Sequence, residues 1–110
     1  MNRALKSILL SAILAAPTAA AADDLEHIFN SLSARQREHV QIRLRQPGFY
    51  KDQVDGQFGA QTARAIRSAT YTPGFPVYRA SALQRGIRDE DKIALYYVMS
   101  NVYLNSVILN

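Results

Sequence analysis

The amino-acid sequence predicts an all-α fold, a small bundle of about three to five helices. Apolar side chains recur three and four residues apart through most of the chain, as they do on the buried face of a helix. Serine or aspartate precedes several of these stretches, and glycine or proline follows them, which is typical of helix starts and ends. The chain has 110 residues and no cysteine, so we expect one small domain that depends on its core.

The N-terminal segment predicts export. Two basic residues precede an apolar run over residues 7–16, and small residues then lead to Ala22 in an A-x-A cleavage pattern. The run is much shorter than the roughly 20 apolar residues that cross a bilayer. We therefore expect residues 1–22 to be a cleaved signal peptide and residues 23–110 to be a domain in the periplasm or outside the cell, without a transmembrane segment.

Charge and composition exclude several classes of function. Cleavage before residue 23 would remove two basic residues and take the net charge from +4 to +2. This weak basic balance gives no indication of nucleic-acid binding. Without cysteine there is no thiol nucleophile. His27 and His39 are too few, and too far apart, for a zinc site. We expect no enzyme, no cofactor and no metal.

Two helices are predicted at the start of the domain, after residue 22. Acidic residues precede an apolar stripe at helical spacing, which predicts a short first helix. The stripe consists of Leu25, Ile28, Phe29 and Leu32. Ser33 stands three residues before Gln36, a capping-box spacing that predicts a second helix over residues 34–46. Pro47 and Gly48 end that helix, with Gly48 as its left-handed cap.

A turn-rich loop leads to a third predicted helix over residues 60–69. One side of this helix carries Thr62, Ala65, Ile66 and Ala69. Two prolines and a glycine over residues 71–78 predict an ordered loop, and residues 81–85 predict a single helical turn that Gly86 ends.

The last predicted element is a long apolar helix from Lys92 to Leu109. Asp89 supplies its cap, and apolar side chains cover most of its surface. Three interpretations remain open. The helix is central and wrapped by the others, or it is a surface for a homo-oligomer or a protein partner, or it attaches to a membrane surface.

A pattern of glycines, aromatics and small residues runs through the middle of the chain. Its members are Gln41, Leu44, Gly48, Phe49, Tyr50, Val54, Asp55, Gly56, Phe58, Gly59, Thr62, Ala65 and Ile66. In order and spacing they resemble the peptidoglycan-binding-like domain, a small three-helix module found on cell-wall hydrolases. The three glycines of its loop predict backbone angles closed to other residues.

The resemblance implies a three-helix core, with the motif over residues 36–69 and a divergent helical part over residues 79–110. It also implies non-catalytic binding of bacterial cell-wall peptidoglycan. Ala69 and Thr70 depart from the phenylalanine and glutamine that the family has there. The alternative is therefore a periplasmic module for protein–protein contact or homodimerisation that keeps the fold and has lost glycan binding.

A ligand groove is expected near the motif loop and the helix that follows it. The aromatic faces of Tyr50, Phe58 and Tyr71 could stack on sugars, while arginine and glutamine side chains would contact carboxylates and amides. The candidate ligand-binding residues are Arg43, Tyr50, Asp55, Gln57, Phe58, Gln61 and Arg64. Plainer roles compete with these. Asp55 stabilises its own turn, the aromatics pack in the core, and the basic helix is a solvated face.

Overall fold

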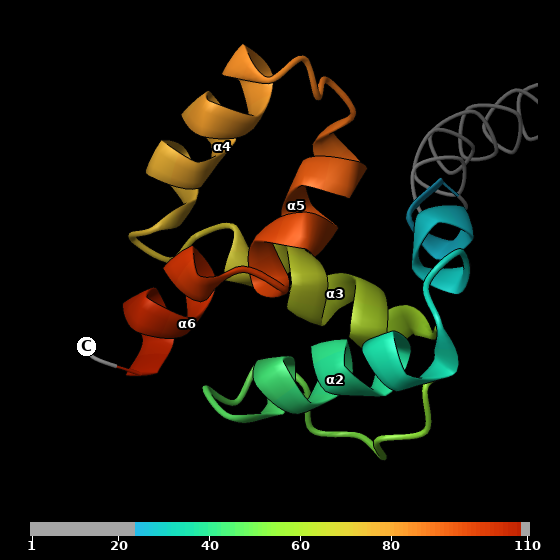
Figure 1. Ribbon diagram of the computed structural model, residues 1–110. Coiled ribbons are helices and arrows are strands. Elements are labelled where there is room, and N and C mark those ends of the chain that lie inside the picture. The colour runs from blue at the N-terminus through green and yellow to red at the C-terminus, as the bar shows by residue number, and fades with distance from the viewer. Residues whose placement is uncertain (1–23, 109–110) are drawn as a thin grey trace, which may run out of the picture.

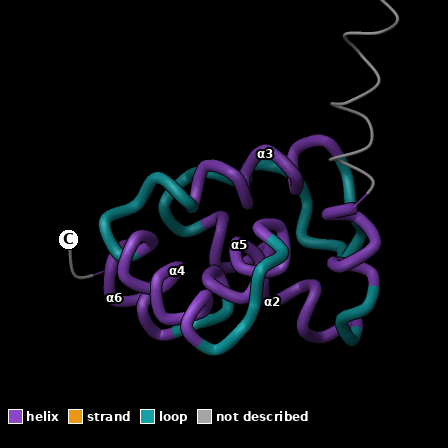
Figure 2. The backbone as a smooth tube through the Cα atoms, turned by 90° about the horizontal axis from the view of Figure 1, so that it is seen from above, coloured by secondary structure: helices purple, strands orange, loops and turns teal. Residues whose placement is uncertain are grey.

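The computed structural model describes residues 24–108, and within them every regular element is a helix (Figures 1 and 2). The elements are a helical segment over residues 24–30, α2 (Ala34–Arg45), α3 (Ala60–Ala69), α4 (Phe75–Gln84), α5 (Glu90–Val98) and α6 (Asn101–Ile108). The predicted all-α class is confirmed, with six helical segments rather than three to five. The predicted signal peptide, residues 1–22, lies outside the described residues.

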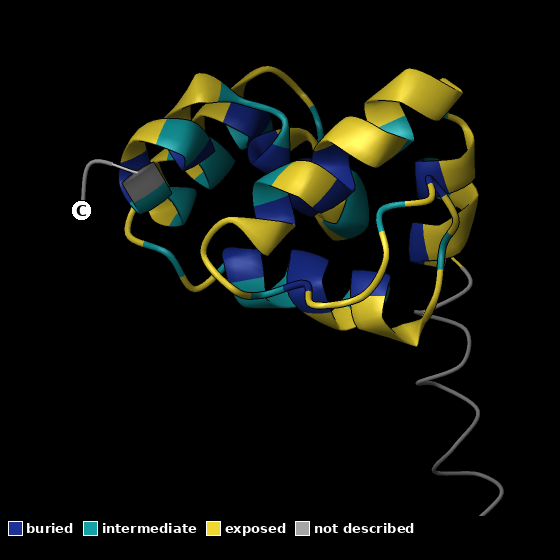
Figure 3. Cartoon of the chain, turned by 90° about the horizontal axis from the view of Figure 1, so that it is seen from below, coloured by how far each residue is buried: buried dark blue, intermediate teal, exposed yellow. Residues whose placement is uncertain are grey.

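Helix α5 is the hub of the fold, because it packs against α2 and α3 and also against α4 and α6. The segment over residues 24–30 completes the core through Leu25 and Phe29, which are fully buried. Buried residues face inward and exposed residues lie on the outside of the helices (Figure 3). The core cluster consists of Leu25, Phe29, Val40, Leu44, Tyr50, Ala65, Ile66, Ala69, Ala94, Leu95, Tyr97, Val98 and Tyr103.

Helices α2 and α3 lie close to their predicted bounds, because their signals are local. The Gln36 N–H donates to Ser33 Oγ at 3.1 Å, and the Ser33 N–H donates to Gln36 Oε1 at 2.9 Å, which is the predicted capping box. Gly48 has a φ of +92° just after α2, as expected of a left-handed cap. The buried residues of α3 are the four predicted ones, Thr62, Ala65, Ile66 and Ala69.

The predicted loop over residues 71–78 is wrong in its second half. Helix α4 starts at Phe75 and runs ten residues, instead of the single turn expected over 81–85. Pro76 stands in the first turn of this helix, where a backbone N–H has no helical partner and proline is tolerated. The predicted stop is confirmed, since Gly86 has a φ of +90° after the end of α4.

The predicted single helix from Lys92 to Leu109 is also wrong, because the chain breaks at Met99 and Ser100 into α5 and α6. Ser100 provides the physical reason. Its hydroxyl accepts from the Tyr103 N–H at 3.3 Å, as the cap of a new helix does. The turn that results lets α6 fold back, so that Tyr103 is fully buried.

The break between α5 and α6 determines which apolar side chains of these two helices are buried. Ile93, Leu95 and Val98 of α5 are buried in the core. Of the three interpretations, α5 therefore fits the one in which the helix is central and wrapped by the others. Tyr96 and Val102 remain 37% exposed. None of the helices between residues 24 and 108 has the length and hydropathy needed to cross a membrane.

Replacing Gly74 with alanine is expected to lower the free energy of unfolding by about 2 kcal/mol, because the added methyl overpacks the contact between α4 and α6. A Cβ at this position would lie 3.0 Å from Val102 Cγ1, 3.1 Å from Ser106 Cβ and 3.1 Å from the Tyr97 hydroxyl. The φ of −78° suits alanine, so the cost is steric alone. Urea unfolding followed by circular dichroism measures it.

Gly59→Ala is the matched control. Gly59 precedes α3 with a φ of −154°, so the left-handed geometry expected there is wrong, whereas it is present at Gly48 and Gly56. A Cβ on Gly59 would have nothing within 4 Å. We expect this variant to unfold at nearly the wild-type urea concentration. Equal stability of the Gly59 and Gly74 variants would contradict the proposed clash.

Candidate functional site

The loop between α2 and α3 is held in shape by a glutamine from α2. Gln41 is fully buried, and its Oε1 accepts from the backbone N–H groups of Asp55 and Gly56 at 3.0 and 2.8 Å. Its Nε2 donates to the Gln57 carbonyl at 2.9 Å. One amide therefore satisfies three backbone groups of the loop, which explains why the motif needs glutamine at this position.

Arg37 holds the same loop from the previous turn of α2. Its Nε donates to the Gly56 carbonyl at 2.8 Å, and its Nη1 donates to the Leu32 carbonyl at 2.7 Å. Gly56 has a φ of +73°, and a Cβ there would lie 3.3 Å from Glu38 Cγ, so the turn requires glycine. The sequence placed Arg37 on a basic helix face and did not predict this structural role, although its position four residues before Gln41 places both on one face of the helix.

The predicted structural role of Asp55 is present, since its Oδ1 accepts from the Gln57 N–H at 2.9 Å. Tyr50 is 3% exposed, and its hydroxyl donates to the Gln53 carbonyl at 2.5 Å. Burial is the main cause that holds the pKa of Tyr50 above its ordinary value, and the carboxylates of Asp55 and Asp52 act in the same direction. Its phenol therefore stays a neutral hydrogen-bond donor at physiological pH.

These contacts form one wall of a hollow of about 300 Å³ between the loop and the start of α3. Six of the seven candidate ligand-binding residues line it, together with Asp52, which sequence reasoning did not single out. The hollow is lined by Tyr50, Asp52, Asp55, Gln57, Phe58, Gly59, Ala60, Gln61, Thr62 and Arg64. We call it the loop hollow. Its size is at the lower end of the range usual for small-ligand sites.

Gln57, Gln61 and Arg64 are the exposed long polar side chains of the loop hollow. Phe58 is half-buried because its ring packs against Phe29, with centroids 5.6 Å apart. The site can thus offer amide and guanidinium donors, carboxylate acceptors and part of one aromatic ring.

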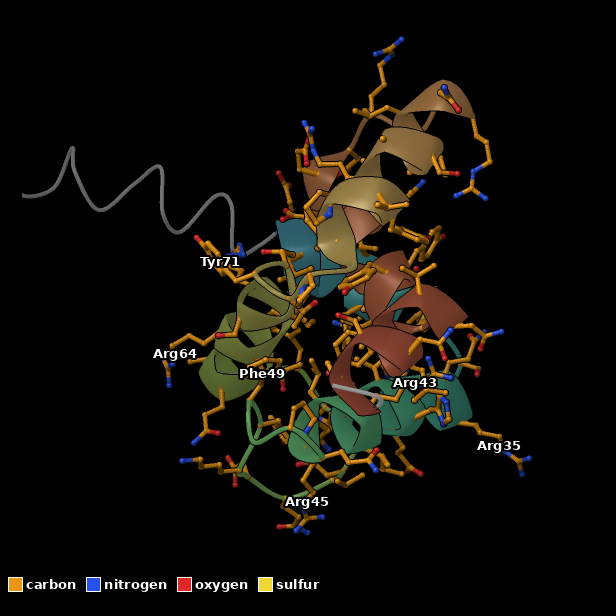
Figure 4. The ribbon with its side chains drawn as sticks, turned by 90° about the vertical axis from the view of Figure 1, so that its left-hand side faces the viewer. Arg35, Arg43, Arg45, Phe49, Arg64 and Tyr71 are labelled. Atoms are coloured by element: carbon orange, nitrogen blue, oxygen red, sulfur yellow. The ribbon has the colours of Figure 1, made fainter. Side chains whose placement is uncertain are left out.

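Arg43, the seventh candidate, lies elsewhere. Its Nη1 donates to the carbonyls of Val98 and Ser100 at 3.0 and 2.8 Å, and its Nε donates to His39 Nε2 at 3.0 Å. Its guanidinium thus satisfies carbonyls at the end of α5. Figure 4 shows Arg43 and Arg64 on different sides of the molecule.

A metal centre would need several histidine or carboxylate side chains close together. No group of three or more histidine, aspartate or glutamate side chains that could hold a metal ion occurs over residues 24–108. His39 instead accepts the bond from Arg43.

Comparison with known families identifies this part of the chain. Residues 33–69 match the model of the family described as "Putative peptidoglycan binding domain". The match is to a binding domain and spans α2, the loop and α3, and so most of the loop hollow's wall. No curated protein and no solved structure gave a significant match. The resemblance seen in the sequence is therefore confirmed, as a match of residues 33–69 to a putative peptidoglycan binding domain.

Proposed function

We propose that this chain is an exported, non-catalytic protein that binds cell-wall peptidoglycan. The observation that carries the proposal is the position of the loop hollow. Six residues chosen from the sequence as ligand contacts line one hollow, and that hollow lies on the segment that matches the binding family. Export through residues 1–22 would place the domain in the periplasm or at the wall, where peptidoglycan lies.

The chemistry of the loop hollow suits peptidoglycan fragments. Stem peptides carry carboxylates and amides, which the Arg64 guanidinium and the amides of Gln57 and Gln61 can bind. Asp52 and Asp55 add negative charge for a stem-peptide amine. Arg43 is left out of the proposed contacts because its Nη1 already donates to two carbonyls.

Sedimentation with purified sacculi tests the proposal. We expect the full chain to pellet with sacculi at low salt and the Arg64→Ala variant to pellet about tenfold less well, because a charge-assisted hydrogen bond is lost. Arg88→Ala is the matched control, since Arg88 is an exposed arginine outside the lining of the loop hollow. Its binding should equal that of the wild type.

A wild-type chain that stays in the supernatant at low salt would overturn peptidoglycan binding. Equal losses in the Arg64 and Arg88 variants would instead show that binding is a general charge effect, and would overturn the loop hollow as the site. Release of soluble muropeptides by the purified chain would overturn the non-catalytic assignment.

The alternative of a module for protein–protein contact or homodimerisation loses part of its support. It rested on the departures at Ala69 and Thr70 and on the apolar surface of a long terminal helix. Five apolar side chains of that surface are buried in the core, namely Ile93, Leu95, Tyr97, Val98 and Tyr103. Sedimentation velocity tests whether the chain associates with itself, and we expect a monomer.

A further inference from the structure

A second, separate hollow lies at the other end of α3 from the loop hollow. It has a volume of about 400 Å³ and lies where the end of α3 meets the starts of α4 and α5. It is lined by Arg67, Thr70, Tyr71, Phe75, Glu90, Asp91 and Ala94. We call it the Tyr71 hollow. Most of its lining residues lie beyond residue 69, so the family match does not account for it.

The two hollows share one face of α3. Ala60 and Arg64 line the loop hollow, while Arg67 and Tyr71 line the Tyr71 hollow. These positions are four, three and four residues apart, the spacing that keeps side chains on one face of a helix. The Tyr71 N–H donates to the Ser68 carbonyl at 3.0 Å, so this residue lies in a hydrogen-bonded turn directly after α3. Figure 4 shows Arg64 and Tyr71 projecting on the same side of the molecule.

Packing in the core does not explain why a tyrosine stands at position 71. Its side chain is 88% exposed, the most exposed large apolar side chain among the described residues, so it adds almost nothing to the core. An aromatic ring held by an ordered turn beside a hollow offers a flat apolar face to a ligand. The pyranose ring of a sugar presents such an apolar face through its C–H groups.

The remaining lining supplies the polar partners that a sugar needs. Asp91 offers a carboxylate acceptor and Arg67 offers guanidinium donors, with Arg67 Nη2 4.0 Å from Asp91 Oδ1. Glu90 is already paired with Arg79, whose Nη2 donates to Glu90 Oε2 at 2.7 Å. Sugar hydroxyls both donate and accept, so they can bond to both kinds of group. Phe75 and Ala94 add an apolar wall to these polar groups, a combination that is typical of small-ligand sites.

We propose that the Tyr71 hollow is a second saccharide subsite, so that a glycan strand lies along the outer face of α3 and fills both hollows. This inference rests on the proposed function. Continued over the turn that follows α3, the helical rise would separate Arg64 and Tyr71 by roughly 10 Å along the axis. That separation is close to the length of one disaccharide, so a unit whose stem peptide fills the loop hollow leaves the Tyr71 hollow to the next disaccharide of a strand.

Calorimetric titration of the full chain with two peptidoglycan fragments tests this. The short fragment is one disaccharide with its stem peptide, and the long fragment is an uncrosslinked strand of several such units. We expect Tyr71→Ala to weaken binding of the long fragment about tenfold, because an aromatic contact is lost, and to change binding of the short fragment less than about twofold. Tyr71→Phe keeps the ring and should bind both fragments like the wild type.

Tyr96→Ala is the matched control, because it removes another exposed tyrosine, on α5, that does not line the hollow. It should bind both fragments as the wild type does. The inference is overturned, with the proposed function left standing, if Tyr71→Ala binds the long fragment as tightly as the wild type. A similar loss in the Tyr96 variant would overturn it too. If the wild-type chain binds neither fragment, the proposed function itself fails.

Discussion

Replacing Gln41 with leucine is expected to lower the free energy of unfolding by about 3 kcal/mol, one of the two largest effects that we predict. Leucine has nearly the volume of glutamine and no polar atoms. The N–H groups of Asp55 and Gly56 and the carbonyl of Gln57 would therefore lose their partner. The Gly56 N–H is buried, so water cannot replace the lost bond without opening the loop.

Urea unfolding measures this change, with Gln84→Leu as the control. Gln84 is an exposed residue at the end of α4, and the same substitution there should alter stability by less than about 0.5 kcal/mol. Because the clamped residues also line the loop hollow, the Gln41 variant should lose sacculus binding as well. A variant as stable as the wild type would show that Gln41 does not hold the loop.

Gln41→Glu separates the loss of the clamp from a loss of packing. A protonated glutamic acid can still donate to the Gln57 carbonyl, 2.9 Å away in the wild type, whereas the ionised form repels that oxygen and the Asp55 carboxylate. Burial and this repulsion raise the pKa of the new carboxyl in the folded state above its unfolded value. The folded state then binds more protons, so relative to the wild type the variant should lose stability as pH rises from about 4 to 7.

Local signals made part of this fold predictable. The capping box at Ser33 depends on residues within one helical turn, and the buried face of α3 follows a regular period. Both were predicted correctly for that reason. The start of α4 was missed because Pro76 and its neighbours indicate a loop by composition, while proline is also compatible with the first turn of a helix.

The break between α5 and α6 could not be read from periodicity. Apolar side chains lie on most sides of this segment, so the pattern does not distinguish one long helix from two short ones. Besides the local cap at Ser100, distant contacts hold the junction. Arg43 donates to the carbonyls at the junction, and its own carbonyl accepts from the Tyr103 hydroxyl at 2.9 Å.

The candidate site, too, was only partly predictable from local signals. The motif specifies a loop geometry, and six residues chosen on or beside that loop line one hollow. Arg43 was chosen for its charge, and charge does not determine where a long side chain points. The sequence presents Tyr71 as a ring that could stack on a sugar but favours packing, so Tyr71 is not among the candidate contacts. The exposure of a tyrosine, which is more often packed, cannot be read from its identity.

Tyr97→Ala is expected to lower the free energy of unfolding by about 4 kcal/mol, the largest effect that we predict. Tyr97 is fully buried, and its ring contacts those of Phe75, Tyr78 and Tyr103 at centroid distances of 5.1, 5.4 and 5.3 Å. The substitution leaves a cavity where α4, α5 and α6 meet. Tyr97→Phe removes only the hydroxyl bond to Thr72 and should cost about 1 kcal/mol.

Tyr96→Ala is the control, because Tyr96 is the next residue on α5 and is 37% exposed. Its loss should be under about 1 kcal/mol by urea unfolding. Similar losses at the two tyrosines would contradict the central position assigned to Tyr97.

Hydrogen exchange of the Tyr97 variant then tests whether the family-matched segment stands alone. That segment, residues 33–69, supplies α2 and α3, but α5 packs against both, and Leu95 and Val98 belong to the same core cluster. Helices α4 and α6 lose their main aromatic contact in the variant, so their amides should lose protection first. If the amides of α2 and α3 lose protection to the same extent, α5 joins both halves into one cooperative unit. Full protection of α2 and α3 would instead mean that the loop hollow survives without the C-terminal helices.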